Sequence, residues 1–581
     1  MATDFYEIWD RYNKAKTYMD KKGMVYRTEK NWLMYSGKQW EAVEDSKGME
    51  DLPMLNFIKP TVKYKAASIA AATITALFSD LNSANNDAQT IEAPVVDPMT
   101  GEPQVDPMTG MPVMQTQVVD SVVGRLNDLF SVSWEKGKMK KNSKKGLTYA
   151  AVEGDCYFFW GEGGDTRLEP QIVHKTSMRL GDENVTDIQR QPWLIIEERL
   201  AVADVRERAR QNGISKEDID EIKPDKELQD SLVNKSEVDD KVTSLLYMEK
   251  DQKTGFISVA KCTQTVMYEK LHPVRQMQGG QYIDVGLKMY PIVPMIWEEM
   301  PNDARGMSEV EQWIPNQLEV NKTLARRAIS IKMTAYPRLA YDDASLANPE
   351  DLDKVGAAIK LNGGNAQAIG NMIAYLSPQA MSADAKELTD ELINVTRTLA
   401  GASDAQLGNI DLSRVSGTAA QTVRDQQQLP LNEQQEMYQD FIENVALLWF
   451  ELWRVYYPEG VEMDGVEVTA EEIADVQPNV RVDIAEDTAL SKMATQQELT
   501  NLFNNGKISF KEFAVAYPEH SSLPKDLLMN IVNEREQMMA QGQMPMTEDG
   551  IPLDPNATGG GVNTGGVSGG SYQSLQSQLA Q

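Results

Sequence analysis

The chain opens with apolar residues at helical spacing. Five of them, three or four positions apart, are Phe5, Ile8, Trp9, Tyr12 and Ala15. This spacing predicts helix within residues 4–34. A second series in steps of three and four consists of Ile58, Val62, Ala66, Ile69, Thr73 and Leu77. It predicts an amphipathic helix over residues 58–77.

The next part of the pattern mixes strands and helices. Residues 147–160 (LTYAAVEGDCYFFW) predict a buried helix that passes into a strand. Strands are expected at 167–174 and 193–198, a helix at 200–212, and a charged surface segment at 213–240. Alternating segments at 242–249, 256–263 and 265–270 predict an antiparallel meander, with Thr254 and Gly255 in the first turn.

Residues 81–118 differ from their surroundings. The six residues VDPMTG at 96–101 recur at 105–110, a nine-residue duplication rich in Pro, Gly and Met. Two copies are too few for a solenoid. Because Asp-Pro and Thr-Gly favour turns, we expect an exposed, mobile insertion.

The second half predicts long helices around a small β module. Ser308 can cap a helix that runs to about Lys332, with acids first and bases last, as the helix macrodipole favours. Strands are expected at 338–341 and 357–361, a helix at 382–399, a Gly- and Ser-bearing loop at 400–417, and a long helix at 418–457. Pro430 lies inside that helix and is expected to kink it. A β pair (461–468 with 480–484), helices at 491–505, 509–516 and 525–540, and a disordered Gly-rich tail follow.

The charge balance limits the classes of function that this chain can have. The 581 residues contain 57 Lys and Arg against 87 Asp and Glu, a formal net charge of −30. A sequence-independent DNA-binding protein neutralises phosphates with Lys and Arg, so this balance excludes a general DNA-binding surface. Contact with nucleic acid then requires a local basic patch or weak contact that lets the nucleic acid move. Residues 136–145 (KGKMKKNSKK) are a basic run, either a solvated helix end or loop, or a contact for phosphate or a partner.

Residues that usually carry catalysis are sparse. The three histidines, His174, His272 and His520, lie far apart and in no metal-ligand spacing. Neither a GxxxxGK[ST] phosphate-binding loop nor a GxSxG nucleophile motif occurs, and residues 161–164 (GEGG) predict a hairpin turn. We expect no catalytic residue, no metal and no cofactor, and we expect Cys156 and Cys262 to be buried free thiols.

Nothing in the sequence predicts a membrane segment. The longest nearly apolar stretch, residues 66–78, has about 13 residues against the roughly 20 that a spanning helix needs. Residues 1–14 are unlike a signal peptide. We expect a protein that is made in a reducing cytoplasm and contacts no membrane.

Eight short strings, in this order, resemble recurrent segments of the portal proteins of tailed bacteriophages. Residues 34–40 (MYSGKQW) and 55–58 (LNFI) are similar to the start of the portal wing. Residues 290–294 (YPIVP), 306–310 (GMSEV) and 317–321 (QLEVN) are similar to the start of the first stem helix. Residues 399–403 (LAGAS) and 416–420 (SGTAA) resemble the tunnel loop and helix, and residues 505–510 (NGKISF) the crown. The resemblance covers roughly residues 30–540. The 81–118 insertion and the short tail depart from it.

The resemblance implies an α+β portal architecture with assigned segments. The wing covers 1–305, the first stem helix 306–332, the clip 333–378, the second stem helix 379–400, the tunnel loop 401–417, and the tunnel helix 418–458. The wing return and crown cover 459–540, and the tail covers 541–581.

The resemblance also implies a function and partners. Portals form a ring, typically of twelve subunits, at one capsid vertex, and double-stranded DNA enters and leaves through its channel. The large terminase docks first and head-completion or tail adaptor proteins replace it. Major capsid and scaffolding proteins are the assembly partners. The expected location is the virion, after synthesis in the host bacterial cytoplasm.

Within this frame we assign candidate sites. Arg414 is the first candidate for a channel residue that faces DNA, followed by Arg326, Arg327 and Lys332; each can instead make salt bridges between subunits. The tunnel-loop candidates are Ala402, Ser403, Gly408, Asn409, Ser416 and Gly417. Candidates for the subunit interface, which can equally be intramolecular core, are Trp313, Ile314, Leu324 and Ile331.

Two other functions stay open. An assembly scaffold or adaptor that binds only proteins predicts no closed ring of fixed size and no basic residue facing a channel. An enzyme acting on nucleic acid predicts nuclease or ATPase activity that a point mutation abolishes, although the sequence offers no recognisable site.

Overall fold

The computed structural model describes seventeen stretches of the chain. They are residues 5–43, 52–70, 73–80, 89–94, 114–119, 121–161, 168–225, 240–278, 281–335, 338–341, 373–376, 384–399, 431–485, 489–505, 507–508, 510–517 and 527–532. The chain forms two compact units, one of Met1–Ala70 with Ile74–Asp483 and one of Ala71–Thr73 with Ile484–Gln581. Helices and sheets are both abundant, which agrees with the predicted α+β class.

The N-terminal helical stretch is two helices. Helix α1 (Phe5–Lys21) and helix α2 (Met24–Ser36) are separated at Gly23, whose φ of 65° lies in the left-handed region that favours glycine. Apolar residues of α1 pack on a sheet, as their spacing predicts: Ile8, Trp9 and Tyr12 join one core with Leu245 and Tyr247.

That sheet has five antiparallel strands in the order β10-β9-β8-β7-β6. They are β6 (Met178–Leu180), β7 (Trp193–Ala201), β8 (Lys241–Lys250), β9 (Ile257–Cys262) and β10 (Met267–Pro273). The meander predicted for β8 to β10 is confirmed. Helices α6 (Val202–Gln211) and α7 (Lys216–Glu221) pack with Val242 and Tyr268 in a separate core. Because side chains alternate along a strand, Val242 faces away from Leu245 and Tyr247, so helices cover both faces of β8.

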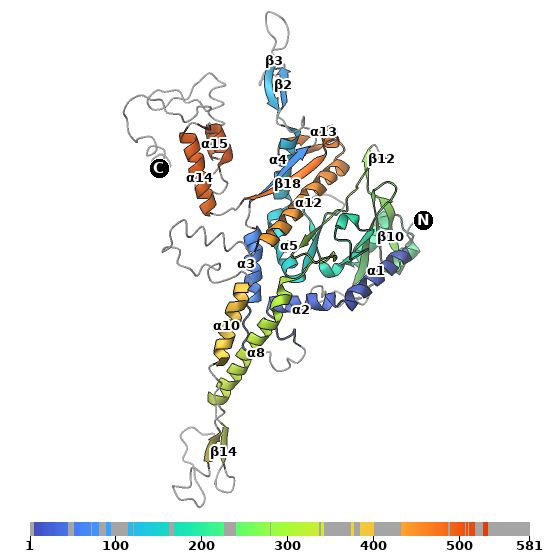
Figure 1. Ribbon diagram of the computed structural model, residues 1–581. Helices are drawn as coiled ribbons and strands as arrows, with labels where there is room; N and C mark the ends of the chain where they lie inside the picture. The colour runs from blue at the N-terminus through green and yellow to red at the C-terminus, as the bar shows by residue number, and fades with distance from the viewer. Residues whose placement is uncertain are drawn as a thin grey trace, which may run out of the picture. The chain divides into compact units, whose positions relative to one another are not determined.

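A second core surrounds a three-stranded sheet, β13-β4-β5. Its strands are β13 (Ile292–Ile296), β4 (Asp155–Phe159) and β5 (Gln171–His174). Around it lie helices α3 (Ile58–Ala70), α4 (Val122–Lys136), α5 (Met139–Glu153) and α12 (Asn432–Tyr456) (Figure 1). Trp449 of α12 contacts the rings of Phe130, Trp134 and Trp160, so aromatic packing joins α12 to segments about 300 residues earlier. The predicted helix-to-strand transition within 147–160 is confirmed at Gly154.

Two sequence predictions are wrong at strand β1 (Thr73–Asp80). The helix predicted to reach Leu77 ends at Ala70, and residues 73–80 form a strand that pairs with β18 (Pro478–Ala485). The β-branched residues Thr73, Ile74 and Thr75 favour a strand, and the partner strand supplies its hydrogen bonds. Consequently β18 does not pair with 461–468. Instead β16 (Val461–Met463) pairs with β17 (Val466–Val468) around Asp464 and Gly465, whose φ values of 50° and 84° suit a tight hairpin.

Smaller elements complete the described chain. Hairpin β2 (Gln89–Pro94) with β3 (Met114–Val119) lies in the predicted insertion, whose duplicated residues fall outside the described ranges. Strands β11 (Arg275–Gln278) and β12 (Gln281–Gly286) pair, and α13 (Ala470–Asp475) starts in a capping box. In the second unit, α14 (Ala489–Asn504) and α15 (Phe510–Ala516) confirm two predicted helices, and Ala514, Tyr517, Leu528 and Val532 form its core. The predicted tail, 541–581, lies outside the described residues.

Candidate functional site

Helix α8 (Glu309–Ala335) is the longest helix in the described chain, about 40 Å at 1.5 Å per residue. The Ser308 hydroxyl accepts the backbone N–H of Val310 at 3.1 Å and donates to the carbonyl of Val152 at 2.7 Å. The predicted cap is therefore confirmed, and it also ties α8 to the end of α5. Pro315 lies inside the second turn, a feature that sequence reasoning did not use.

The N-terminal half of α8, which we call its root, brings together several of the sequence segments on which the portal resemblance depends. The Gln317 Oε1 accepts the backbone N–H of Phe57 at 3.1 Å, and the Asn321 Oδ1 accepts that of Leu55 at 3.0 Å. The Asn321 amide also donates to Gln39, and Asn56 donates to the carbonyl of Tyr35 at 3.1 Å. Strings 34–40, 55–58 and 317–321 therefore meet around one helix, although up to about 280 residues separate them in sequence.

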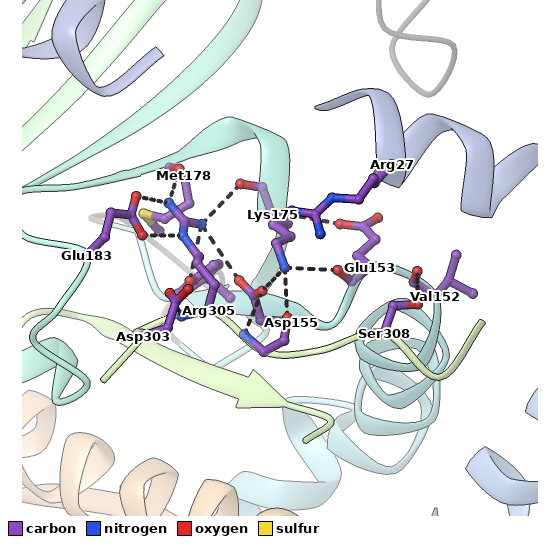
Figure 2. A network of polar contacts seen from close by, with 12 residues as sticks. Arg27, Val152, Glu153, Asp155, Lys175, Met178, Glu183, Asp303, Arg305 and Ser308 are labelled. Atoms are coloured by element: carbon purple, nitrogen blue, oxygen red, sulfur yellow. Dashed lines mark hydrogen bonds and ion pairs between the residues drawn. The ribbon is translucent and has the colours of Figure 1, made fainter. Parts of the chain in front are cut away.

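Just before α8, Arg305 lies in a buried ion network (Figure 2). Its guanidinium is 2 % exposed and holds both oxygens of Glu183, with Nε–Oε2 at 2.8 Å and Nη2–Oε1 at 3.0 Å. It also donates to the carbonyl of Met178 at 3.0 Å and lies 3.6 Å from the Asp155 carboxylate. Two-point carboxylate binding fixes the orientation of an arginine as well as its position.

Lys175 completes the network from the other side (Figure 2). Its ammonium lies 2.7 Å from Asp155 Oδ1 and donates to the carbonyls of Gly306 at 2.9 Å and Glu153 at 3.1 Å. The backbone N–H of Gly306 donates to the same Asp155 oxygen at 3.1 Å. A Cβ on Gly306 would lie 2.2 Å from the carbonyl oxygen of Gly154, so only glycine allows the backbones to approach this closely.

A polar and aromatic cluster adjoins the network at Glu153. One Glu153 oxygen lies 2.6 Å from His174 Nδ1 and accepts the Trp32 indole N–H at 2.8 Å. The other accepts the backbone N–H of Lys175 at 2.9 Å. The Tyr149 ring stacks on His174 at 4.7 Å. The cluster links α2, α5 and β5, and the partners of the buried Glu153 side chain suit a structural role.

The two buried thiols and the buried Tyr157 hydroxyl are protonated at neutral pH. Burial raises the pKa of the Cys156 thiol and of the Tyr157 hydroxyl well above their ordinary values. Burial also raises the pKa of the Cys262 thiol to about 12. Both cysteines are free and buried, as predicted. A neutral buried thiol is a poor nucleophile, so neither is an activated cysteine.

Helix α10 (Asp384–Leu399) lies beside α8 (Figure 1). The Asn316 amide of α8 donates to the Thr396 hydroxyl of α10 at 2.9 Å, and Thr389 and Thr396 are each 2 % exposed. Large apolar side chains of the pair are exposed instead: Ile329 41 %, Ile331 64 %, Leu388 48 % and Val395 46 %. We call these four residues the apolar stem surface, after the stem helices of the resemblance; Ile329 and Ile331 are two positions apart and therefore lie on different sides of α8. In a helix pair that is stable by itself, aliphatic side chains are usually buried and polar side chains such as threonine face solvent. These buried threonines and exposed aliphatic side chains show the opposite distribution.

Between the two helices in sequence lies a small antiparallel hairpin. Strand β14 (Arg338–Tyr341) confirms the predicted strand and pairs with β15 (Ile373–Leu376), which the sequence did not predict. The strand expected at 357–361 lies outside the described residues.

The candidate residues on α8 occupy different environments. Trp313 and Ile314 are buried within the chain, Leu324 is half-buried and Ile331 is exposed. Arg326 is exposed and lies 3.6 Å from Glu319 of the same helix. Arg327 is half-buried and Lys332 is exposed.

The remaining candidates lie outside the described residues. They are Arg414, Pro430 and the tunnel-loop residues Ala402, Ser403, Gly408, Asn409, Ser416 and Gly417. Helix α12 spans Asn432–Tyr456, which confirms the later part of the long helix predicted to end near residue 457.

A cleft of about 680 Å³ lies beside α12. The Glu451–Arg454 ion pair, at 2.6 Å, supplies its charged lining, and Leu447, Phe450 and Ile473 are among its apolar residues. Among the described residues, no three His, Cys, Asp or Glu side chains are grouped to hold a metal ion. No helix in the part of the chain that is described is long and apolar enough to cross a bilayer.

No family model matches the chain, and a comparison with curated proteins finds no match.

Replacement of Arg305 by Met is expected to destabilise the first unit by about 3–5 kcal/mol, because it leaves Glu183 buried without its counter-ion, while Asp155 keeps only Lys175. Urea unfolding followed by tryptophan fluorescence measures the change. Arg190→Met is the matched control, since Arg190 is 81 % exposed and makes only a surface ion pair with Asp187. Its effect should stay within about 0.5 kcal/mol. Equal effects of the two substitutions would show that the network does not hold the root of α8.

Proposed function

We propose that this chain is a phage portal protein. It forms a non-enzymatic ring at one capsid vertex, and genomic double-stranded DNA is packaged and ejected through the ring. The large terminase docks on it during packaging, and head-completion or tail adaptor proteins follow. Capsid and scaffolding proteins are its assembly partners, and the mature protein resides in the virion after synthesis in the bacterial cytoplasm.

The apolar stem surface carries this proposal. Four large aliphatic side chains are exposed along two adjacent helices, while the contact between those helices is partly polar. Scattered exposed apolar residues are ordinary, but a series on one helix pair fits contact with another copy of the same pair. A ring closes when each copy presents one face to the next and receives a different one, which is a heterologous interface.

The order of elements supports the same proposal. A mixed body leads into α8, then the β14–β15 hairpin, then α10 and, later, the long helix α12. This order matches wing, stem, clip, stem and tunnel helix. The net charge of −30 suits a channel in which DNA slides without tight binding. In this proposal Arg414, Arg326, Arg327 and Lys332 are the residues that meet DNA or pair between subunits.

The alternative is an assembly adaptor that binds only other proteins. The same exposed aliphatic side chains on α8 and α10 fit a groove on a different partner. The two functions differ in whether the purified chain closes into a ring with a central hole.

We expect the purified chain to form a closed ring. Twelve copies of a 64.9 kDa chain have a mass of about 780 kDa. Mass photometry should show a species near this mass, and negative-stain images of the same sample should show a central hole. The measurement is made with and without the scaffolding protein over a range of salt concentrations, because either can control closure. A stable dimer or trimer without a hole under all of these conditions would favour the adaptor.

The double substitution Ile331→Asp and Leu388→Asp should abolish the ring, because it places charges in the proposed contact between stems. Both side chains are about half exposed or more, so the melting temperature of the monomer should change little. Tyr6→Asp is the control, since Tyr6 is 71 % exposed on α1. If the double variant forms rings as well as the wild-type chain does, the apolar stem surface is not required for assembly.

Deletion of residues 402–415 should leave rings intact and impair DNA packaging or retention, because the proposed tunnel loop surrounds the DNA. In vitro packaging followed by nuclease protection measures both. Arg414→Ala tests the contribution of one positive charge in the same assay. Normal packaging and retention by the deletion variant would show that the tunnel loop is assigned wrongly.

A further inference from the structure

Four lysines lie together on the surface of α5. Lys140, Lys141, Lys144 and Lys145 are all exposed. Side chains four residues apart on a helix are neighbours, so the positions i, i+1, i+4 and i+5 form one face. We call these residues the lysine face of α5. The helix is labelled in Figure 1 and its opposite side, with Ser143, Gly146 and Leu147, is buried in the core.

No ion pair among the described residues neutralises this face, although Lys141 helps to lower the pKa of the Glu169 carboxyl, which the hydrogen bond from Lys138 lowers most. Lys136 and Lys138, just before it, pair with Asp464 and Glu169, each at 2.8 Å. Within the described ranges, none of the four lysines lies within ion-pair distance of a carboxylate. The Lys145 ammonium lies 5.3 Å from the centre of the Tyr149 ring. Four positive charges therefore face solvent together on a chain whose net charge is −30.

The four lysines destabilise the helix on which they lie. Two like-charged pairs, 140 with 144 and 141 with 145, are four residues apart and repel one another. Lys140 and Lys141 lie in the first turn, at the positive end of the helix macrodipole, and that turn contains no acidic residue. The preceding Lys138 has a φ of 51° and makes no side-chain capping hydrogen bond. Neither packing nor capping accounts for the lysines, so their placement points to a binding role.

The chemistry of the face favours nucleic acid over protein. Between and beside the lysines, α5 contributes the half-buried Asn142, Thr148 and Tyr149, and the Tyr149 ring is already stacked on His174; no aliphatic or aromatic side chain of this helix side is fully exposed. The cores of protein interfaces are depleted in lysine and depend on apolar or aromatic anchors. Duplex DNA needs no such anchor, because it presents one negative charge per about 1.7 Å of its axis to any closely spaced set of cations.

We propose that the lysine face of α5 binds the phosphate backbone of duplex DNA without reading its sequence. The proposal goes beyond the ring and does not require it, because it depends on residues of one helix. In a portal the ligand would be the packaged genome. The surplus of acidic residues elsewhere confines the contact to this face and keeps it weak.

The test compares two variants with the same change in net charge. In the first, Lys140, Lys141, Lys144 and Lys145 are replaced by Gln. In the control, four exposed lysines elsewhere are replaced by Gln: Lys21, Lys216, Lys223 and Lys253. Fluorescence anisotropy of a labelled random-sequence DNA duplex is measured with the full chain between 50 and 200 mM salt. Four phosphate contacts predict that wild-type affinity falls on the order of 100-fold over this range.

We expect the first variant to lose at least about tenfold in affinity at 50 mM salt and most of its salt dependence, while the control keeps both. Its thermal midpoint should be unchanged or higher, because like-charge repulsion is removed, so unfolding cannot explain the loss. Equal affinities of the variants would overturn the proposal, as would the absence of DNA binding by the wild-type chain. Poly-L-glutamate and unlabelled duplex are compared as competitors of the labelled DNA. If poly-L-glutamate displaces the labelled DNA as effectively as unlabelled duplex does, the lysine face instead binds an acidic protein.

Mass photometry of the same samples separates this proposal from the ring. The first variant should assemble as wild type does, since the lysine face is not part of the apolar stem surface. If wild-type protein binds DNA through α5 but never closes into a ring, the DNA-binding proposal stands and the portal proposal is rejected. Loss of assembly in this variant alone would overturn the assignment to DNA and make the face a contact between subunits.

Discussion

The buried ion network around Arg305 is the constraint on which the arrangement of the first unit depends. Removing charges from water is costly, and that loss is offset only when each charge meets a partner in good geometry. Arg305, Glu183, Asp155 and Lys175 meet this condition together. Because β4, β6 and the segment before α8 contribute carbonyl groups or side chains, the network fixes where the longest described helix begins.

Several buried polar contacts hold the start of α8 against the rest of the first unit. The buried amides of Gln317 and Asn321 hold the 55–57 segment against α8, and the Lys65–Glu309 ion pair, at 2.7 Å, holds α3 against it. Farther along, Thr389 and Thr396 of α10 are buried, and the Thr396 hydroxyl accepts a hydrogen bond from Asn316 of α8. The helix pair is therefore well anchored at one end, while some of its described aliphatic side chains remain exposed farther along. The proposed contact with a second copy would cover them.

Charge is distributed in two opposite ways in this chain. Acidic residues dominate overall, whereas four exposed lysines without a described ion pair lie together on one face of α5. The general surplus reduces non-specific attraction to polyanions, and the local cluster restores it at one place. Both features agree with the proposed weak contact between this chain and DNA.

The sequence by itself determined the elements whose signals are local. Apolar spacing predicted α1 and the β8–β10 meander, and Ser308 with its neighbouring acids marked the start of α8. These predictions depend on residues within about one helical turn or one hairpin of each other. The apolar character of Cys156 and Cys262 and their surroundings was also sufficient to predict buried free thiols.

Only the tertiary structure decided the pairing of β1 with β18, the Arg305 network and which faces of α8 and α10 remain exposed. Residues 73–77 continue the helical spacing of α3, yet a partner about 400 residues away makes them a strand. Arg305 and Glu183 are 122 positions apart, and nothing in either neighbourhood predicts the pair. Helical periodicity states which residues share a face but not what covers that face. That depends on non-local packing, in which burial and charge pairing outweigh local preference.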